Sequence, residues 1–453
     1  MRNLIYVHTH DTGRFIQPYG HGVNTPHLMR LAQEGVLFRH AYCAAPTCSP
    51  SRSAMLTGVP AHECGMTGLA HRGFSLTDEA RRRHLANFLA SQGYETVLAG
   101  VQHETRAGTE STLGYQRVIP RGGTQGGAKG DGGGAGRHID YGTAEAAAEY
   151  LRSRPQRPFF LAVGFTSTHR EFPELDEGEG CPPDCDPRYV ALPPTLYDSP
   201  QNREDMARYN RSAHIADDCI GIVLQALEEA GLAEETVVMY TTDHGIAFPR
   251  HKCNLYDTGI GVALILRYPG CPRGRVVDAL VSHLDVYPTL CELIGVAPPQ
   301  GLRGHSLVPV ITGERASVRD EVFAEVSYHA AYDPQRCVRT ERYKLIRRYE
   351  ALERVVPANI DDGPAKSFML DAGLLDVRLP REELFDLYLD PTERVNLVRD
   401  SHYMAIYEDL AARLDRWMRE TNDPLVRYSS VPKPEGARVN KRTTLSPRDA
   451  DYE

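Results

Sequence analysis

The segment from Cys48 to Arg52 reads Cys-Ser-Pro-Ser-Arg and combines a nucleophile with a fixed cation. Pro50 fits the first turn of a helix and therefore places Cys48 at or just before a helix N-terminus. Free backbone amides and the positive end of the helix dipole favour an anion at that position. Arg52, one turn further on, adds a planar fork of donors that suits an oxyanion. The segment predicts an anion-binding site that contains a nucleophile.

Two pairs of potential metal ligands follow apolar strands. Asp243 and His244 come after one such strand, and His10 and Asp11 follow the N-terminal run Leu4–Val7. In open parallel sheets, ligands gather at the carboxyl ends of the strands. An Asp and a His at a strand end can both bind one metal ion. Ca²⁺ prefers oxygen ligands, whereas imidazole suits Mn²⁺, Zn²⁺ or Fe²⁺.

The elements that must position these residues alternate between strand and helix. This alternation predicts an α/β fold with a largely parallel central sheet covered on both faces. Strands are expected at 4–7, 36–42, 96–99, 159–165, 236–241 and 262–267. Helices are expected from 26, from 77 to about 93, and at 143–153, 203–230 and 283–294.

The pattern changes after about residue 316. Residues 1–315 are interpreted as the catalytic domain and residues 316–453 as a smaller C-terminal α+β subdomain with a tail. Short strands are expected at 321–327, 336–347 and 384–387, and a helix at about 403–419. The polar tail beyond Asn422 is expected to wrap the surface or a partner subunit, which allows a homo-oligomer. Residues 121–137 hold nine glycines without the order of a phosphate-binding loop, so a surface loop or lid is expected.

Composition excludes several classes of protein. The net charge of −9 lacks the basic excess of a nucleic-acid binder. No apolar run is long enough to span a membrane, and residues 1–10 show no signal peptide, so a cytoplasmic protein is expected. Ten cysteines in 453 residues do not suggest a disulfide scaffold. Cys181 and Cys185 form a C-x3-C pair without a second pair, which favours structural or free thiols over a zinc site.

The Cys48 segment, continued by Ser53-Ala54-Met55-Leu56-Thr57-Gly58, resembles the signature of the sulfatase family. The resemblance implies an alkaline-phosphatase-like three-layer sandwich. It also implies that a dedicated maturation enzyme oxidises Cys48 to formylglycine. In that family one hydroxyl of the hydrated aldehyde attacks sulfur, and the second helps to expel sulfate. An unmodified thiol does not support this route.

The resemblance also implies one divalent metal ion. Tyr240-Thr241-Thr242-Asp243-His244-Gly245 is similar to the family strand that ends in Asp-Asn-Gly or Asp-His-Gly. The family usually has Asp-Asp where this chain has His10 and Asp11. The implied ligands are therefore Asp11, Asp243, His244, the Cys48 position and His10. The family metal is Ca²⁺, but the two histidines also allow Mn²⁺ or Zn²⁺. His10 could instead lie outside the ligand shell.

Further site residues follow from the same resemblance. Lys252 resembles the sulfate-binding lysine, and His169 the leaving-group histidine. His103 matches the histidine of the family's Gly-Lys-x-His stretch, in which Val101 replaces the lysine. Gln102 or Arg170 could compensate for that missing cation.

These residue types suit the transfer of a sulfuryl group. A divalent metal, Arg52 and Lys252 would hold the anionic oxygens and stabilise the charge of the transition state. Asp243 could accept a proton from the nucleophilic hydroxyl. His169 or His103 would donate a proton to the leaving oxygen or nitrogen.

The expected substrate is a sulfate ester or sulfamate on a sulfated sugar. The segments 245–249, 254–256 and 25–28 look most like the heparan N-sulfatase (sulfamidase) branch, which suggests N-sulfoglucosamine. Residues 339–344 and 383–393 resemble the family's small C-terminal subdomain. Two alternatives are a phosphonate or phosphodiester hydrolase of the same superfamily and an inactive homologue that only binds sulfated glycans.

Overall fold

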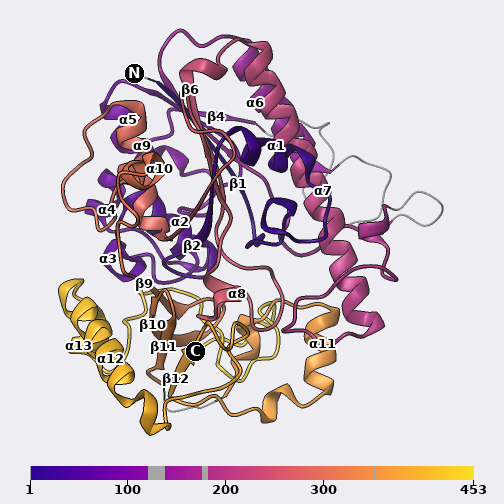
Figure 1. The fold of residues 1–453 in the computed structure, drawn as a ribbon, viewed down its shortest axis with the longest axis vertical. Helices are drawn as coiled ribbons and strands as arrows, with labels where there is room; N and C mark the ends of the chain where they lie inside the picture. Colours follow the sequence, from indigo (N-terminus) through magenta and orange to yellow (C-terminus); the bar gives the residue numbers. More distant parts are fainter. Residues whose placement is uncertain (1, 121–137, 176–181, 351–353) are drawn as a thin grey trace.

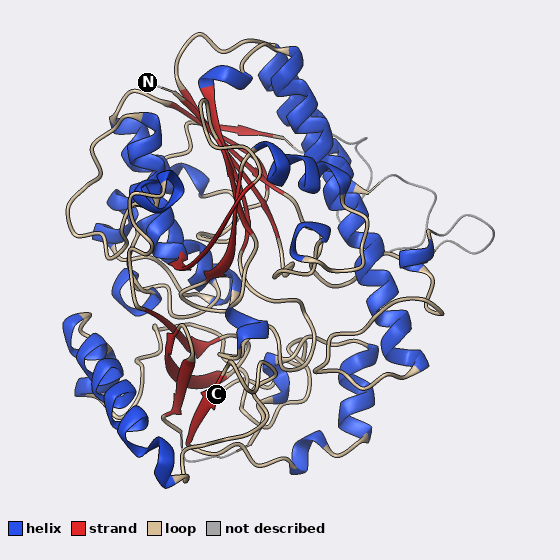
Figure 2. Cartoon of the chain, in the orientation of Figure 1, coloured by secondary structure: helices blue, strands red, loops and turns tan. Residues whose placement is uncertain are grey.

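An eight-stranded sheet with helices on both faces makes up the larger part of the protein (Figures 1 and 2). The computed structural model describes residues 2–120, 138–175, 182–350 and 354–453. The sheet order is β4-β3-β5-β1-β6-β7-β2-β8. Strand β7 is antiparallel to both neighbours, and the other neighbours are parallel. The strands are β1 Asn3–Thr9, β2 Val36–Tyr42, β3 Glu95–Gly100, β4 Arg117–Ile119, β5 Phe159–Gly164, β6 Thr236–Thr242, β7 Leu264–Arg267 and β8 Arg275–Ser282.

The central strands are apolar because both faces of the sheet are covered. Every residue of β1, β5 and β6 is buried, as expected for parallel strands between two helix layers. On one face β1 and β5 pack with α1, α6 and α7, and the other face packs with helices that include α5 and α9. The helices of this part are α1 Pro26–Glu34, α2 Cys48–Thr57, α3 Ala61–Cys64, α4 Asp78–Arg83, α5 Leu85–Ser91, α6 Ile139–Arg152, α7 Pro200–Glu229, α8 Asp257–Ile260, α9 Val286–Ile294 and α10 Val308–Thr312. The predicted three-layer α/β sandwich is confirmed.

A second sheet of four antiparallel strands forms the C-terminal part. Its order is β12-β11-β10-β9, and it begins at Glu321, close to the predicted boundary at residue 316. Helix α12 packs against it, with Trp417 stacked on Phe323. The elements are β9 Glu321–Tyr328, β10 Tyr332–Thr340, β11 Tyr343–Arg348, β12 Glu382–Asp386, α11 Pro364–Asp371, α12 Met404–Glu420 and α13 Pro424–Arg427.

The polar tail follows the surface of its own chain. Asn440 forms isolated bridges with Ala331 and Tyr452, and its side-chain oxygen accepts a hydrogen bond from Arg72. The tail therefore joins the small subdomain to the catalytic domain. The glycine-rich segment 121–137 and Cys181 lie outside the described residues. Among the described helices, none is both long and apolar enough to cross a membrane.

A buried ionic cluster joins α3 of the catalytic domain to the small antiparallel sheet. His62 Nδ1 lies 2.8 Å from Glu325 Oε1, and Arg336 donates to Asp423, which caps α13. All four side chains are at most 2% exposed. Burial opposes protonation of His62, but the neighbouring Glu325 and Asp423 carboxylates outweigh it and raise the pKa of His62.

The raised pKa of His62 gives the cluster a predicted pH dependence. A raised pKa stabilises the folded state below the unfolded value of 6.5, and this contribution is lost as pH rises through the folded value. We expect His62→Asn to lower the free energy of unfolding by about 3 kcal/mol in acidic solution, because the buried carboxylates lose their cation. The loss is expected to shrink as pH rises through the raised pKa of His62. Denaturant unfolding of both proteins across this range measures the difference.

His84 provides the control because it is a buried histidine with the opposite shift. Burial lowers its pKa to about 4. A lowered pKa makes the folded state lose stability as pH falls below the unfolded value. His84→Asn should therefore show its larger deficit at high pH. A His62→Asn deficit that grows with pH would contradict a protonated His62.

Candidate active site

Helix α2 begins at Cys48, as the position of Pro50 predicts. All ten residues of α2 are buried, and Gly58 ends the helix in the left-handed conformation with φ +72°. Burial raises the pKa of the Cys48 thiol above its ordinary value. An unmodified thiol here is therefore a weak nucleophile near neutral pH, because the thiolate is the reactive form.

The two pairs of predicted metal ligands, His10-Asp11 and Asp243-His244, meet because β1 and β6 are parallel neighbours in the sheet. Thr9 is in register with Thr242, so His10-Asp11 and Asp243-His244 leave the sheet side by side. The backbone amide of Asp11 donates to Asp243 Oδ1 over 2.8 Å. Asp11 has φ +46°, a conformation uncommon outside glycine and often found at functional sites.

These residues form a donor set that fits a divalent metal ion. Ligand atoms of His10, Asp11, Cys48 and Asp243 all lie within 4.8 Å of one another. His244 Nε2 is 3.4 Å from both Cys48 Sγ and Asp11 Oδ1. His10 Nδ1 is buried 3.4 Å from Asp243 Oδ2, and within the described part of the chain it makes no hydrogen bond. A buried nitrogen that makes no hydrogen bond but lies beside a carboxylate is what a metal ligand would show before its ion is bound.

Two buried cations border the donor set. Arg52 is 1% exposed and donates to Asp243 Oδ2 through Nε at 3.2 Å and through a terminal nitrogen at 3.1 Å. Its other terminal nitrogen lies 2.5 Å from His8 Nδ1. Lys252 Nζ is 2.9 Å from Asp11 Oδ2 and 2.8 Å from Asp361 Oδ2. Sequence reasoning did not select Asp361 because it lies in a loop with no recognisable signal.

The predicted histidines complete the same site. The His103 ring lies 4.4 Å from that of His10, and the His169 ring lies 5.6 Å from it. His169 Nε2 is 3.9 Å from Asp11 Oδ2, and its side chain is 37% exposed. Burial lowers the pKa of His10 and His103, and the Arg52 cation lowers both further. Both rings are therefore neutral near pH 7, whereas His169 is the most exposed of the three.

The loop that carries His169 is fixed by α6. Asp140, in the first turn of that helix, accepts hydrogen bonds from the backbone amides of Thr166 and Ser167 and from the Thr166 hydroxyl. An acidic side chain suits this position beside the helix N-terminus. Asp140 therefore sets the path of the chain just before His169.

The two residues proposed to replace the missing lysine at Val101 both bond elsewhere. The Gln102 side-chain oxygen accepts from the amides of Glu104 and Thr105, and its side-chain nitrogen donates to the Thr105 carbonyl. Arg170 makes a two-pronged ion pair with Asp205, with distances of 2.8 and 2.6 Å. Neither side chain therefore replaces the missing lysine as a donor at the group formed by Cys48 and the proposed metal ligands, called the Cys48 cluster below.

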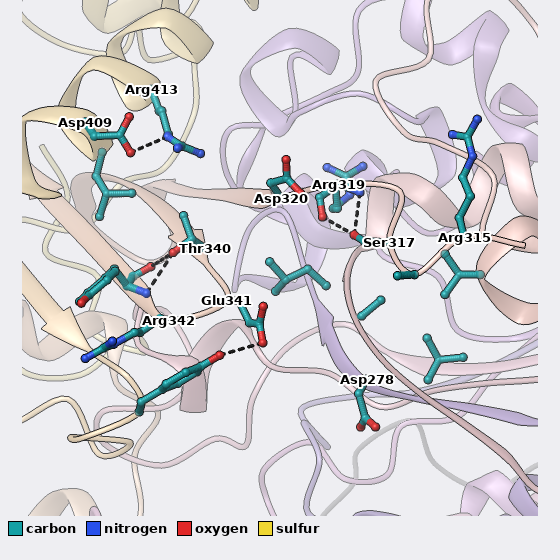
Figure 3. A pocket seen from close by; sticks show the side chains of 18 of the residues that line it. Asp278, Arg315, Ser317, Arg319, Asp320, Thr340, Glu341, Arg342, Asp409 and Arg413 are labelled. Carbon is teal, nitrogen blue, oxygen red and sulfur yellow. Dashed lines mark hydrogen bonds and ion pairs between the residues drawn. The ribbon is translucent and has the colours of Figure 1, made fainter. Parts of the chain in front are cut away.

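A large cavity lies away from these residues. It has a volume of about 1150 Å³ and is bordered by β8, the 313–320 segment, the turn between β10 and β11, and α12 (Figure 3). None of the predicted site residues lines it. Among its labelled charged side chains, Arg413 forms an ion pair with Asp409. The cavity is therefore separate from the candidate active site.

Comparison with known proteins establishes the family. Residues 2–296 match the sulfatase family, and residues 244–366 match the C-terminal region described as N-sulphoglucosamine sulphohydrolase, C-terminal. The N-sulphoglucosamine sulphohydrolase of Homo sapiens is 30% identical, and the alignment covers 94% of this chain and 91% of that protein.

Solved structures show the same fold. A 2-O GAG sulfatase superposes with a TM-score of 0.71 at 20% identity, covering 100% of this chain and 99% of the other. The phosphonate monoester hydrolase of Agrobacterium radiobacter gives a TM-score of 0.68 at 20% identity, covering 93% and 96%.

The central sheet, the small antiparallel sheet and the structural matches define an alkaline-phosphatase-like fold. Within that class, the chain belongs to the sulfatase family. The predicted family and enzyme class are confirmed.

Proposed function

We propose that the protein hydrolyses a sulfate ester or sulfamate of a sulfated sugar, after a maturation enzyme has converted Cys48 to formylglycine. The observation that carries the proposal is the Cys48 cluster. A helix-start cysteine points its sulfur at Asp11 and His244, between the buried cations Arg52 and Lys252. Hydrated formylglycine would supply the nucleophilic hydroxyl that the buried thiol does not.

The same cluster would hold one divalent metal ion. His10, Asp11, Asp243, His244 and the side chain at position 48 are its proposed ligands. The ion would neutralise the anionic oxygens of the substrate and the nucleophile. Two imidazoles beside two carboxylates favour Mn²⁺ or Zn²⁺ over Ca²⁺.

The remaining side chains have separate tasks. Arg52 and Lys252 would face the sulfuryl oxygens, where their positive charge is strong because the site is buried. Asp243 would accept the proton of the attacking hydroxyl. His169, the more exposed ring, would donate a proton to the leaving oxygen or nitrogen at the mouth of the site.

The proposed substrate class follows two of the sequence similarities described above. The match to the N-sulphoglucosamine sulphohydrolase C-terminal region and the 30% identity to the human enzyme both support a sulfated glucosamine. A sulfamate nitrogen leaves as an amine, so it would depend on His169 for its proton.

Peptide mass spectrometry and rate measurements test the proposal together. Protein co-produced with the maturation enzyme should show the mass decrease that accompanies replacement of the Cys48 thiol by an aldehyde. The converted protein should release sulfate from N-sulfoglucosamine or an aryl sulfate faster than it cleaves an aryl phosphodiester. An unmodified Cys48 in a sample that still releases sulfate would contradict the proposed nucleophile.

Phosphonate or phosphodiester hydrolysis is the second candidate. The structural similarity to the phosphonate monoester hydrolase and the presence of His244 in the donor set support it. Sulfate and phosphate are both tetrahedral oxyanions, so the same cations would bind either. Faster cleavage of the phosphodiester in the rate comparison would favour this candidate.

A further inference from the structure

Lys252 is held between two carboxylates that come from different parts of the chain. Asp11 follows β1 of the central sheet, whereas Asp361 lies in the small subdomain between residues 357–359 and helix α11. We propose that Asp361 is a positioning residue that aims the Lys252 ammonium at the substrate oxyanion, so that the small subdomain completes the active site. This proposal rests on the proposed function of Lys252 as an oxyanion-binding cation.

The number of donors on Lys252 supports this role. An ammonium group has three N–H bonds. Lys252 Nζ donates one of them to Asp11 Oδ2 at 2.9 Å and forms an ion pair with Asp361 Oδ2 at 2.8 Å, and Lys252 is only 3% exposed. The two carboxylates therefore fix the position of the ammonium between them, and among the described contacts no further acceptor competes for the N–H that would face an oxygen of the substrate. Lysine otherwise has a flexible stem that does not set a direction by itself.

The segment that carries Asp361 is itself held firmly. The Asn359 side chain forms two hydrogen bonds with the backbone of Ala331. On the other side, Lys366 Nζ donates to the Ile360 carbonyl, to Asp362 Oδ1 and to the Leu445 carbonyl. A side chain held by neighbours with satisfied bonds keeps its position better than one on an unsupported loop.

The same segment is tied to the loop that carries His169. Arg170 forms an ion pair with Asp205 of α7, and Asp205 Oδ2 also accepts the backbone amide of Ala365. A Cβ atom at Gly363 would lie 2.2 Å from the Arg170 guanidinium, so only glycine fits there without movement. The Lys252 partner and the proposed proton donor are thus held by one connected network.

Asp361 has two opposite effects on binding of the anionic substrate: its charge repels the substrate, and its contact with Lys252 aims the ammonium. Whether binding weakens or tightens when Asp361 is removed therefore shows which effect is larger. A carboxylate near an oxyanion pocket repels the substrate, so a residue acting by charge alone would weaken binding. A residue that aims Lys252 would strengthen binding. Loss of Asp361 would also leave Lys252 drawn to Asp11 alone, which turns the ammonium away from the substrate position.

The test compares Asp361→Asn with the wild-type enzyme, using inorganic sulfate as a competitive inhibitor. We expect the inhibition constant of sulfate and the KM of the sulfated substrate to rise together by about tenfold, within the range typical for the loss of a supporting partner. Asp361→Glu keeps the charge but displaces the ammonium. Asp361→Glu should also weaken sulfate binding, and it replaces Asp361→Asn in this test if the asparagine variant does not fold.

Asp362→Asn is the matched control. Asp362 pairs with Lys366 and Ser446 and makes no contact with Lys252 among the described interactions. It should lower thermal stability without changing the sulfate inhibition constant. Unchanged or tighter sulfate binding in Asp361→Asn would overturn the positioning role. If the wild-type enzyme cleaves phosphodiesters instead of sulfates, the proposed function fails, and the same comparison with inorganic phosphate still tests Asp361.

Discussion

Cys48→Ala is expected to reduce sulfate release by a factor of about 10⁴ or more, since loss of a covalent nucleophile removes most of the rate enhancement. The alanine retains the helix start and the buried cations but offers no atom for conversion to an aldehyde. Folding should be nearly unchanged, because the Cys48 sulfur makes only long contacts, 3.4 Å to His244 and 4.0 Å to Asp11. Turnover of an aryl sulfate and of N-sulfoglucosamine measures the loss.

Cys64→Ala is the matched control for this experiment. Cys64 is also fully buried at a short helix, but its thiol donates to the carbonyl of Ala61 and does not take part in the donor cluster. It should retain most of its turnover per folded molecule. Equal activity in Cys48→Ala and Cys64→Ala would exclude Cys48 as the origin of the nucleophile and would favour catalysis by another group.

The sequence predicts strands correctly where every residue of the strand is buried. Strands β1, β5 and β6 are buried along their whole length, so their apolar runs are clear in the sequence. Strand β8 was not predicted, because it lies at the edge of the sheet and exposes Val276 and Asp278, which interrupts its apolar pattern. The single helix predicted from residue 77 is divided at His84, whose ring caps the second helix instead of continuing the first.

The site was predictable where adjacent residues in the sequence share a strand end. The pairs after β1 and β6 meet because parallel neighbours end at the same edge of a sheet. Asp361 has no such signal, since its position depends on how the small subdomain docks. The structure also places His8 against Arg52, with His8 Nδ1 2.5 Å from a terminal guanidinium nitrogen. Contacts of this kind depend on tertiary packing that local patterns do not encode.

Asp243 connects the cations to the proposed metal ligands. Its Oδ1 accepts the backbone amides of Asp11 and His244, and its Oδ2 accepts two bonds from Arg52. Burial alone would raise its pKa, but His244 and Arg52 outweigh burial and hold the pKa of Asp243 well below the ordinary value. The carboxylate is therefore ionised across the physiological range and keeps the buried Arg52 neutralised.

Asp243→Asn should consequently damage both metal binding and stability. Removing one partner of a buried ion pair typically costs about 3–5 kcal/mol, because Arg52 stays buried without a counter-charge. The affinity for Mn²⁺, measured by calorimetry, should fall by more than the roughly 10–100-fold that loss of a supporting partner costs. Turnover should fall with it, since the proposed base is lost as well.

Asp285→Asn separates the two effects. Asp285 is a fully buried carboxylate that pairs with Arg319 and accepts the backbone amides of Ser282 and His305, outside the donor cluster. It should lower the free energy of unfolding by a similar amount yet leave Mn²⁺ affinity and turnover per folded molecule unchanged. If Asp243→Asn binds Mn²⁺ as tightly as Asp285→Asn, Asp243 is not a metal ligand. Its role is then to neutralise and position Arg52.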